Sequence, residues 1–144
     1  MAKLKATRQA QYVLGAEFTF NFDDTVVNSS GAEVDGGKTN TAATSVDIIE
    51  LPYGATIVGG EVVTDTAFDA ATFNVTVGDS GSAARYLGTT DRKGAGRTPL
   101  VPTGYVGEGQ ALRLTFTPAD ACTAGKMTVR VLYTVIGRGN ENSF

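Results

Sequence analysis

Apolar and polar side chains alternate, one for one, in several separate stretches of this chain. The clearest stretch covers residues 71–77, where a Phe and two Val alternate with Thr and Asn. The same alternation appears in residues 17–22, 111–117 and 126–136. A period of two is typical of a β-strand with one buried face. The pattern therefore predicts an all-β protein, and no stretch favours a helix longer than one turn.

These stretches and weaker ones amount to about eight strands, separated by turn residues at the spacing expected of a sandwich or barrel. We expect a single-domain antiparallel β-sandwich, jelly-roll-like, in which the Phe, Val and Leu faces of two sheets meet. Two antiparallel pairs are expected between neighbouring strands. Residues 55–68 should pair with 71–77 across a tight turn at Asp69-Ala70, and 111–117 with 126–136.

Two strands show a departure from simple alternation. In residues 45–51 the apolar side switches, which indicates a bulge or a strand covered on both faces. In residues 126–136, Leu132 and Ile136 lie opposite the main apolar row. The far end of this last strand is therefore expected to be covered on both faces.

Two long connections, residues 23–44 and 92–109, are rich in glycine. Such segments read as loops. Thr25–Val27 is expected to form a short strand within the first connection. In the second, Pro99 and Pro102 exclude a helix and fit the edge of a sheet.

At 144 residues the chain has the length of one domain, which is enough to bury an ordinary core. We divide it into an N-terminal arm of residues 1–16, a β-sandwich domain of residues 17–137 and a C-terminal tail of residues 138–144. The arm carries three cations and no acid. Such an end is either solvated or ordered by contact with a neighbouring subunit, and both remain open.

The net charge of −3 and the pI near 4.8 argue against a dedicated nucleic-acid binder, which usually presents a basic face. No apolar run approaches the ~20 residues of a membrane-spanning helix, so no membrane partner is expected. The basic N-terminus is interrupted by Gln9 and Gln11, which does not suit a secretion signal. We therefore expect a protein made and kept in a cytoplasm. The single cysteine, Cys122, cannot form an internal disulfide.

The segment Gly78-Asp79-Ser80-Gly81 is similar to the nucleophile motif of trypsin-like proteases. That chemistry requires a base to accept the hydroxyl proton, usually a histidine, and the chain has none. The four residues are predicted to form a turn instead. Without histidine, zinc is disfavoured, and the acids do not have the spacing of a calcium loop. We therefore predict no enzyme activity, no metal site and no cofactor.

A basic, glycine-rich segment occupies residues 92–97. It lacks the spacing of a phosphate-binding P-loop. It is either a solvated loop or a charge contact with an acidic neighbour. Together with the arm it supplies the residues that we expect to contact a partner: Lys3, Lys5, Arg8, Tyr12, Arg92, Lys93 and Arg97.

Residues 51–91 contain an LP-x-GATIVGG-x-V opening, then AFD, TFNVTVGDSG and RYLGTTD. This series, continued to about Ile136, resembles a group of small all-β virion structural proteins of tailed bacteriophages. The resemblance implies a capsid decoration (cement) protein that binds the outer surface of the shell, bridges neighbouring major capsid subunits and stabilises the shell. It also implies a homotrimer on the capsid exterior, synthesised in the host cytoplasm.

Two other functions remain open. A receptor- or carbohydrate-binding module of a phage tail or head fibre would require exposed aromatic side chains, for which Tyr53, Tyr86 and Tyr105 are the candidates. The chain could also be another minor virion structural protein.

Overall fold

The computed structural model describes residues 13–135, and these contain eleven β-strands and no helix. Nothing in this range forms a helix with the length and hydrophobicity needed to cross a bilayer. The strands are β1 (Leu14–Asn21), β2 (Thr25–Val27), β3 (Glu33–Asp35), β4 (Thr44–Ile49), β5 (Tyr53–Thr66), β6 (Phe73–Gly78), β7 (Leu87–Asp91), β8 (Gly96–Pro99), β9 (Val106–Glu108), β10 (Leu112–Pro118) and β11 (Lys126–Val135).

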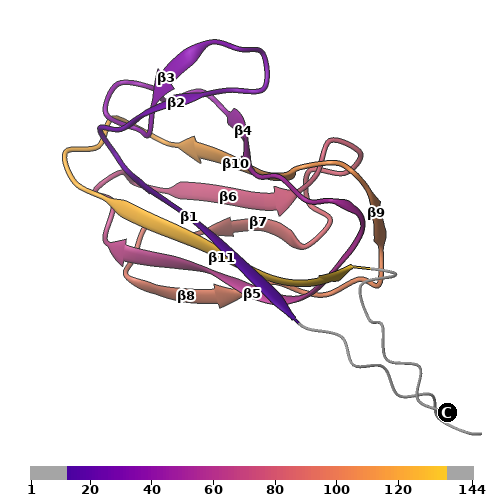
Figure 1. The fold of residues 1–144 in the computed structure, drawn as a ribbon. Helices are drawn as coiled ribbons and strands as arrows, with labels where there is room; N and C mark the ends of the chain where they lie inside the picture. The colour runs from indigo at the N-terminus through magenta and orange to yellow at the C-terminus, as the bar shows by residue number, and fades with distance from the viewer. Residues whose placement is uncertain (1–12, 136–144) are drawn as a thin grey trace, which may run out of the picture.

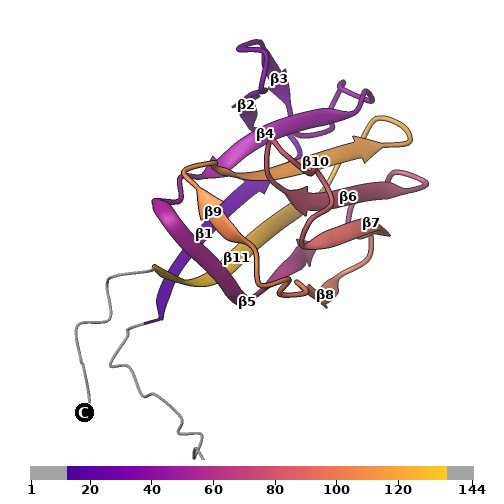
Figure 2. The same ribbon diagram turned by 90° about the vertical axis from the view of Figure 1, so that its right-hand side faces the viewer.

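Two antiparallel sheets form the body of the molecule (Figures 1 and 2). One has the order β1-β11-β5-β8, with β9 also paired to β5, and the other has the order β4-β10-β6-β7. The chain passes from one of these two sheets to the other between most consecutive strands. Among the described strands of the two sheets, only β6 and β7 are neighbours in sequence that also pair with each other. This interleaved order is that of a jelly roll, so the predicted all-β, jelly-roll-like sandwich is confirmed.

A cluster of stacked phenylalanines fills the space between the sheets. Phe73 lies at its centre, with ring centroids 3.8 Å from Phe68 and 5.7 Å from Phe116. Phe20 of β1 stacks on Phe116 at 5.3 Å. All four are almost fully buried. In β6 and β10 every second residue is buried in this core, because successive side chains of a strand point to opposite faces.

Both predicted pairs of neighbouring strands are wrong. β5 and β6 lie in different sheets, and so do β10 and β11. The two connections instead cross the sandwich and bind each other. Asp69 accepts a hydrogen bond from the backbone N–H of Thr123 at 2.8 Å, and Asp120 accepts one from Ala71 at 3.1 Å. Because the crossings are held together in this way, residues 67–72 form a bridge between sheets rather than a hairpin turn.

Other predicted details of the strands are confirmed. Ile49 pairs with Leu112 and Asp47 with Arg113, so Ile48 is the extra residue of a β-bulge. β2 forms in the first long connection, where it pairs with β3, and the β2–β3 hairpin stands beside the two sheets in Figure 1. β8, which ends at Pro99, lies at the margin of its sheet.

The Gly78–Gly81 segment forms a turn, as predicted. The Asp79 carboxylate accepts hydrogen bonds from the backbone N–H groups of Gly81 and Ser82, both at 2.9 Å. It also binds Arg85, whose Nε lies 2.7 Å away. Asp79 thus organises the connection between β6 and β7.

Candidate functional site

The face of the β1-β11-β5-β8 sheet turned away from the core, here called the outer face, carries a row of alternating charges. Glu17 of β1 accepts a hydrogen bond from Arg130 Nε of β11 at 3.0 Å. A second nitrogen of Arg130 lies 3.4 Å from Glu61 of β5, and Arg97 Nε of β8 lies 2.6 Å from the same carboxylate. The charged row, defined as these four residues, therefore crosses four strands.

The register of the sheet brings these charges together. Glu17 and Glu61 are the direct partners of Arg130 on its two sides. The hydrogen bond from Arg97 and the attraction of Arg130 lower the pKa of Glu61, and the hydrogen bond to Glu17 raises the pKa of Arg130. Exposed ion pairs of this kind contribute little to stability. Their effect is to hold two acids and two cations in a defined pattern on the surface.

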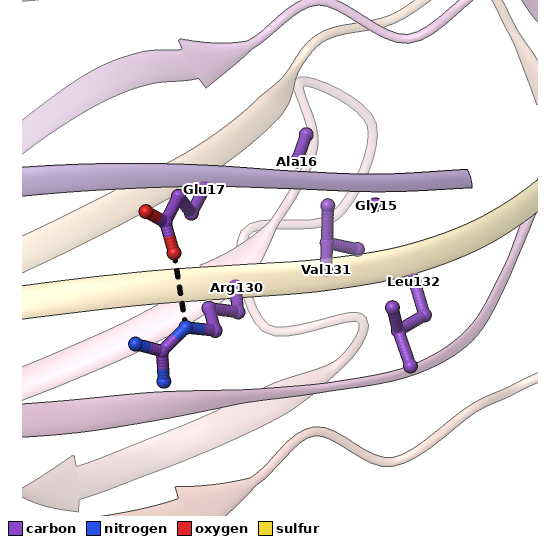
Figure 3. Close-up of a pocket in the computed structure, with 6 residues that line it drawn as sticks. All are labelled: Gly15, Ala16, Glu17, Arg130, Val131 and Leu132. Carbon is purple, nitrogen blue, oxygen red and sulfur yellow. Dashed lines mark hydrogen bonds and ion pairs between the residues drawn. The ribbon is translucent and has the colours of Figure 1, made fainter.

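Next to the charged row stands an exposed leucine. Leu132 of β11 pairs with Gly15 of β1 on one side and Gly59 of β5 on the other, and it is 45% exposed. The surface is hollow on both sides of Leu132. Gly15, which has no side chain, lies in one hollow, and Gly60 of β5 lies in the other. One hollow, of about 320 Å³, is lined by residues that Figure 3 draws: Gly15, Ala16, Glu17, Arg130, Val131 and Leu132.

The expectation that the far end of β11 is covered on both faces is wrong for Leu132 within this chain. Other apolar side chains are also exposed at this end of the sheet, where β1 begins and β11 ends. Val58 lies at the bulge of β5 opposite Leu132 and Tyr133, and it is 43% exposed. Val106 of β9, beside Thr56, is 41% exposed. Apolar side chains gathered on an open surface are typical of a binding face.

The predicted contact residues of the arm, Lys3, Lys5, Arg8 and Tyr12, lie outside the described residues. β1 begins at Leu14, so residues 14–16, which we assigned to the arm, are paired with β11.

The three predicted contact residues of the basic segment do not form a single patch. The Arg92 guanidinium turns back to bind the Gly94 carbonyl at 2.7 Å, and its Nε is buried without a partner among the described residues. Lys93 donates to the Ala71 carbonyl at 2.7 Å. Arg97 alone reaches the outer face, where it joins the charged row. The contact role of all three stays a prediction.

The candidate aromatic side chains for sugar binding do not lie together on the surface. Tyr86 is 4% exposed. Tyr105 lies under the guanidinium of Arg85, 3.6 Å from its ring centroid, and accepts a hydrogen bond from Gln110. Of the three tyrosines, only Tyr53 is largely exposed to solvent.

A polar hollow lies at the β2–β3 hairpin, and Asp35 is one of the residues that line it. Burial alone would raise the pKa of Asp35. Hydrogen bonds from the Thr39 side chain and from the backbone N–H groups of Gly37, Thr39 and Asn40 lower it to about 2. Such hydrogen bonds, from several backbone N–H groups of one loop to a single Asp carboxylate, are typical of a turn that the side chain stabilises. Across residues 13–135, His, Cys, Asp and Glu nowhere form a group of three that could hold a metal ion.

Sequence reasoning missed the outer face because its residues come from four strands. Glu17 and Leu132 lie at opposite ends of the described chain, and only the register of β1 on β11 brings them close. The one local signal was Leu132 itself, an apolar residue out of phase with the apolar row of its strand.

No family model matches the sequence, and a search of curated proteins finds no match. Solved structures of phage capsids do contain similar chains. A chain of the cyanophage Pam1 capsid asymmetric unit aligns with a TM-score of 0.62 at 21% identity, covering 93% of this chain and 94% of that chain. A chain of the acid-stable capsid of Helicobacter pylori bacteriophage KHP30 aligns with a TM-score of 0.59 at 20% identity, covering 92% and 94%.

A chain of the capsid of Ralstonia phage GP4 aligns with a TM-score of 0.54 at 15% identity, covering 95% of this chain and 91% of that chain. These likenesses extend over nearly the whole of each chain. The fold of this protein is therefore one that occurs in phage capsids, and the resemblance to phage virion proteins is confirmed at the level of the fold.

Proposed function

We propose that this chain is a structural protein of a bacteriophage virion that decorates the outer surface of the capsid shell. The observation that carries the proposal is the likeness of nearly the whole chain to chains of three phage capsids. No catalytic role is part of the proposal. The work of such a protein is to bind neighbouring shell subunits and hold them together.

The charge of the body supports a place on the outside of the shell rather than the inside. Residues 13–135 hold fourteen acids and eight cations, a net charge of −6. The inner surface of a filled capsid faces packaged DNA, which is a dense polyanion. A body with this charge is repelled by DNA, whereas on the exterior its charge is screened by solvent and salt.

The outer face supplies a surface suited to binding the major capsid protein. Leu132 offers an apolar contact between two hollows, and the charged row fixes the pattern of charge beside it. Apolar contacts give affinity, and paired charges set register. The partner-contact residues predicted from the sequence, Lys3, Lys5, Arg8, Tyr12, Arg92, Lys93 and Arg97, belong to the same proposal.

Self-association as a homotrimer completes the proposal. Each subunit of a closed oligomer contributes the same contact, so three modest contacts give a much higher avidity than one. A trimer that touches several shell subunits at once resists their separation without strong individual contacts.

The test is the copy number of this chain in purified virions, measured by quantitative mass spectrometry against the major capsid protein. A simple ratio with hundreds of copies supports a shell component. A dozen copies or fewer would place the chain at a vertex, neck or fibre and overturn decoration.

A second experiment separates decoration from a role as the major capsid subunit. Phage that lack this chain should still assemble shells, and those shells should bind the purified protein at fixed stoichiometry. Failure to assemble any shell would show that the chain builds the lattice itself.

A further inference from the structure

β1 leaves one side of its backbone without a partner strand among the described residues. It is the first strand of its sheet and pairs only with β11, from Leu14 opposite Tyr133 to Asn21 opposite Lys126. In Figure 1 it is the indigo strand beside β11. An exposed edge presents free N–H and C=O groups, which are a template for another strand.

The other sheet margins carry features that hinder such pairing, and β1 does not. β4 contains the bulge at Ile48, and β7 has an irregular register against β6. β8 has four residues and ends in Pro99, and β9 has three residues. β1 has eight residues in unbroken register, without proline or lysine. Its free edge is capped at the last residue, Asn21, which exchanges hydrogen bonds with Asp24, so the part open to a further strand is residues 14–20. Short edges, bulges, proline and lysine are the usual guards against strand addition.

The core is also incompletely covered along this edge. Phe20 is 1% exposed, but Leu14, Ala16 and Phe18, which point inward from the same strand, are only half-buried. A further strand beside β1 would cover these three side chains with its own apolar face.

Residues 1–12 have the sequence of such a strand. Apolar residues occupy the even positions except for Arg8, and polar residues occupy the odd positions after Met1. Glycine, proline, asparagine, aspartate and serine, which make turns, do not occur before Gly15. The sequence therefore disfavours a tight turn that would return this segment to its own β1. Twelve extended residues span about 40 Å, enough to reach a neighbouring molecule.

Charge complements the geometry. Residues 1–12 carry a net charge of +3, from Lys3, Lys5 and Arg8, whereas residues 13–135 carry −6. The side chain of Glu17 on β1 is 59% exposed despite its bond to Arg130. A segment laid along β1 would place lysines beside this carboxylate.

We propose that residues 1–12 of a second copy of this chain add as a β-strand to the free edge of β1. The added strand supplies backbone hydrogen bonds to the edge and apolar side chains to the half-covered row. This inference rests on the self-association within the proposed function and deepens it, because it names the segment and the surface that receives it.

The test uses the purified full-length protein without capsids. Its oligomeric state is measured by sedimentation equilibrium over a range of concentrations. Leu4→Glu places a charge on the apolar side of the segment and should weaken association at least tenfold. Thr7→Glu adds the same charge on the polar side and should leave association within about twofold of wild type. A monomer at all concentrations, or equal effects of the two variants, would overturn the proposal.

A crosslinking experiment identifies the contact. Equal amounts of ¹⁴N- and ¹⁵N-labelled protein are mixed, dissociated and reassociated, and treated with a zero-length amine–carboxylate crosslinker. Bonds from Lys3 or Lys5 to Glu17 should join differently labelled copies. Bonds found only within one copy would refute the exchange between molecules. Because no capsid is present, these results and the copy number in virions can fail independently.

Discussion

Asp79 and Asp47 offer a matched test of how burial determines the strength of an ion pair. Arg85 Nε lies 2.7 Å from Asp79, and Arg113 Nε lies 2.8 Å from Asp47. The Asp79 side chain is 5% exposed and the Asp47 side chain 47%. Asp79 also accepts bonds from two backbone N–H groups of its turn. Replacing each aspartate by asparagine compares one chemical change in two settings.

The structure sets the expected magnitudes. Removing one partner of a fully buried ion pair costs about 3–5 kcal/mol, and a hydrogen bond to a charged group contributes about 1.5–3 kcal/mol. Arg85 is 21% exposed and stacks on Tyr105, so it regains some hydration when its partner is lost. We expect Asp79→Asn to lower the free energy of unfolding by about 2–3 kcal/mol. Asp47→Asn should cost less than about 1 kcal/mol.

The assay is urea unfolding at neutral pH and one protein concentration, with the m-value checked for each variant. Ser80→Ala is the control for the turn itself. Ser80 is exposed, and its replacement should change stability by less than about 0.5 kcal/mol. Equal costs for Asp79→Asn and Asp47→Asn would refute the argument that burial and the turn bonds make the Asp79 pair strong.

The pH dependence gives an independent check. Burial alone would raise the pKa of Asp79, but hydrogen bonds from Arg85, Ser82 and Gly81 outweigh it and hold the pKa below its ordinary value. The carboxylate therefore stabilises the fold above about pH 4, and this contribution is lost as the pH falls through the lowered pKa. The stability gap between wild type and Asp79→Asn should narrow below pH 4.

Three further predictions concern other parts of the molecule. The pKa of Asp35 is lowered to about 2, so its carboxylate stabilises the fold down to low pH. After discounting for solvent screening, the free energy of unfolding should fall by about 1–2 kcal/mol as the pH drops from about 4 to 2. In Asp35→Asn, this pH-dependent loss of stability should be absent. At Gly125 the backbone φ is +148°, and an added Cβ would lie 2.1 Å from the Phe68 ring. Gly125→Ala should therefore lower the free energy of unfolding, measured with denaturant, by about 2–4 kcal/mol. Gly88→Ala is the control and should be near neutral, because nothing surrounds the position of its added Cβ. Cys122 is 2% exposed, and burial raises the pKa of its thiol. A chromogenic thiol reagent should therefore react with it only as fast as the protein unfolds locally or globally. Rapid stoichiometric labelling of the native protein would contradict its burial.

The positions of the strands follow from the sequence, but their partners do not. Alternation in residues 71–77 and 111–117 reports that one face is buried, and β6 and β10 indeed bury that face. The alternation does not indicate which strands pair with each other or which sheet packs against the buried face. The connections at Asp69 and Asp120 carry ordinary turn residues, and they cross the sandwich because they bind each other. Such long-range contacts have no local signature.

Because long-range contacts leave no local signature, the candidate site was also hard to predict from the sequence. Arg92, Lys93 and Arg97 form one basic segment in the sequence. In the structure, Arg92 and Lys93 bind nearby carbonyl groups, and Arg97 crosses to Glu61 on another strand. Charge in the sequence shows where cations are, and the register of the sheet decides which of them face solvent. Leu132 was detectable as an irregularity in its strand, but the two glycines that expose it lie on neighbouring strands.

The two surfaces that the fold leaves incomplete point in different directions. The outer face, with Leu132 and the charged row, is directed perpendicular to its sheet, whereas the free edge of β1 lies in the plane of that sheet. Glu17 belongs to both surfaces, but the other three residues of the charged row lie on β11, β5 and β8, away from this edge. A strand added to β1 therefore leaves most of the outer face accessible. Under the proposed function, a subunit bound to a shell through the face also binds its own copies through the edge, and each of the two proposed contacts brings the partners of the other close together. Multiple weak contacts arranged in this way produce high avidity, so neither surface requires a large apolar patch that would make the free subunit aggregate.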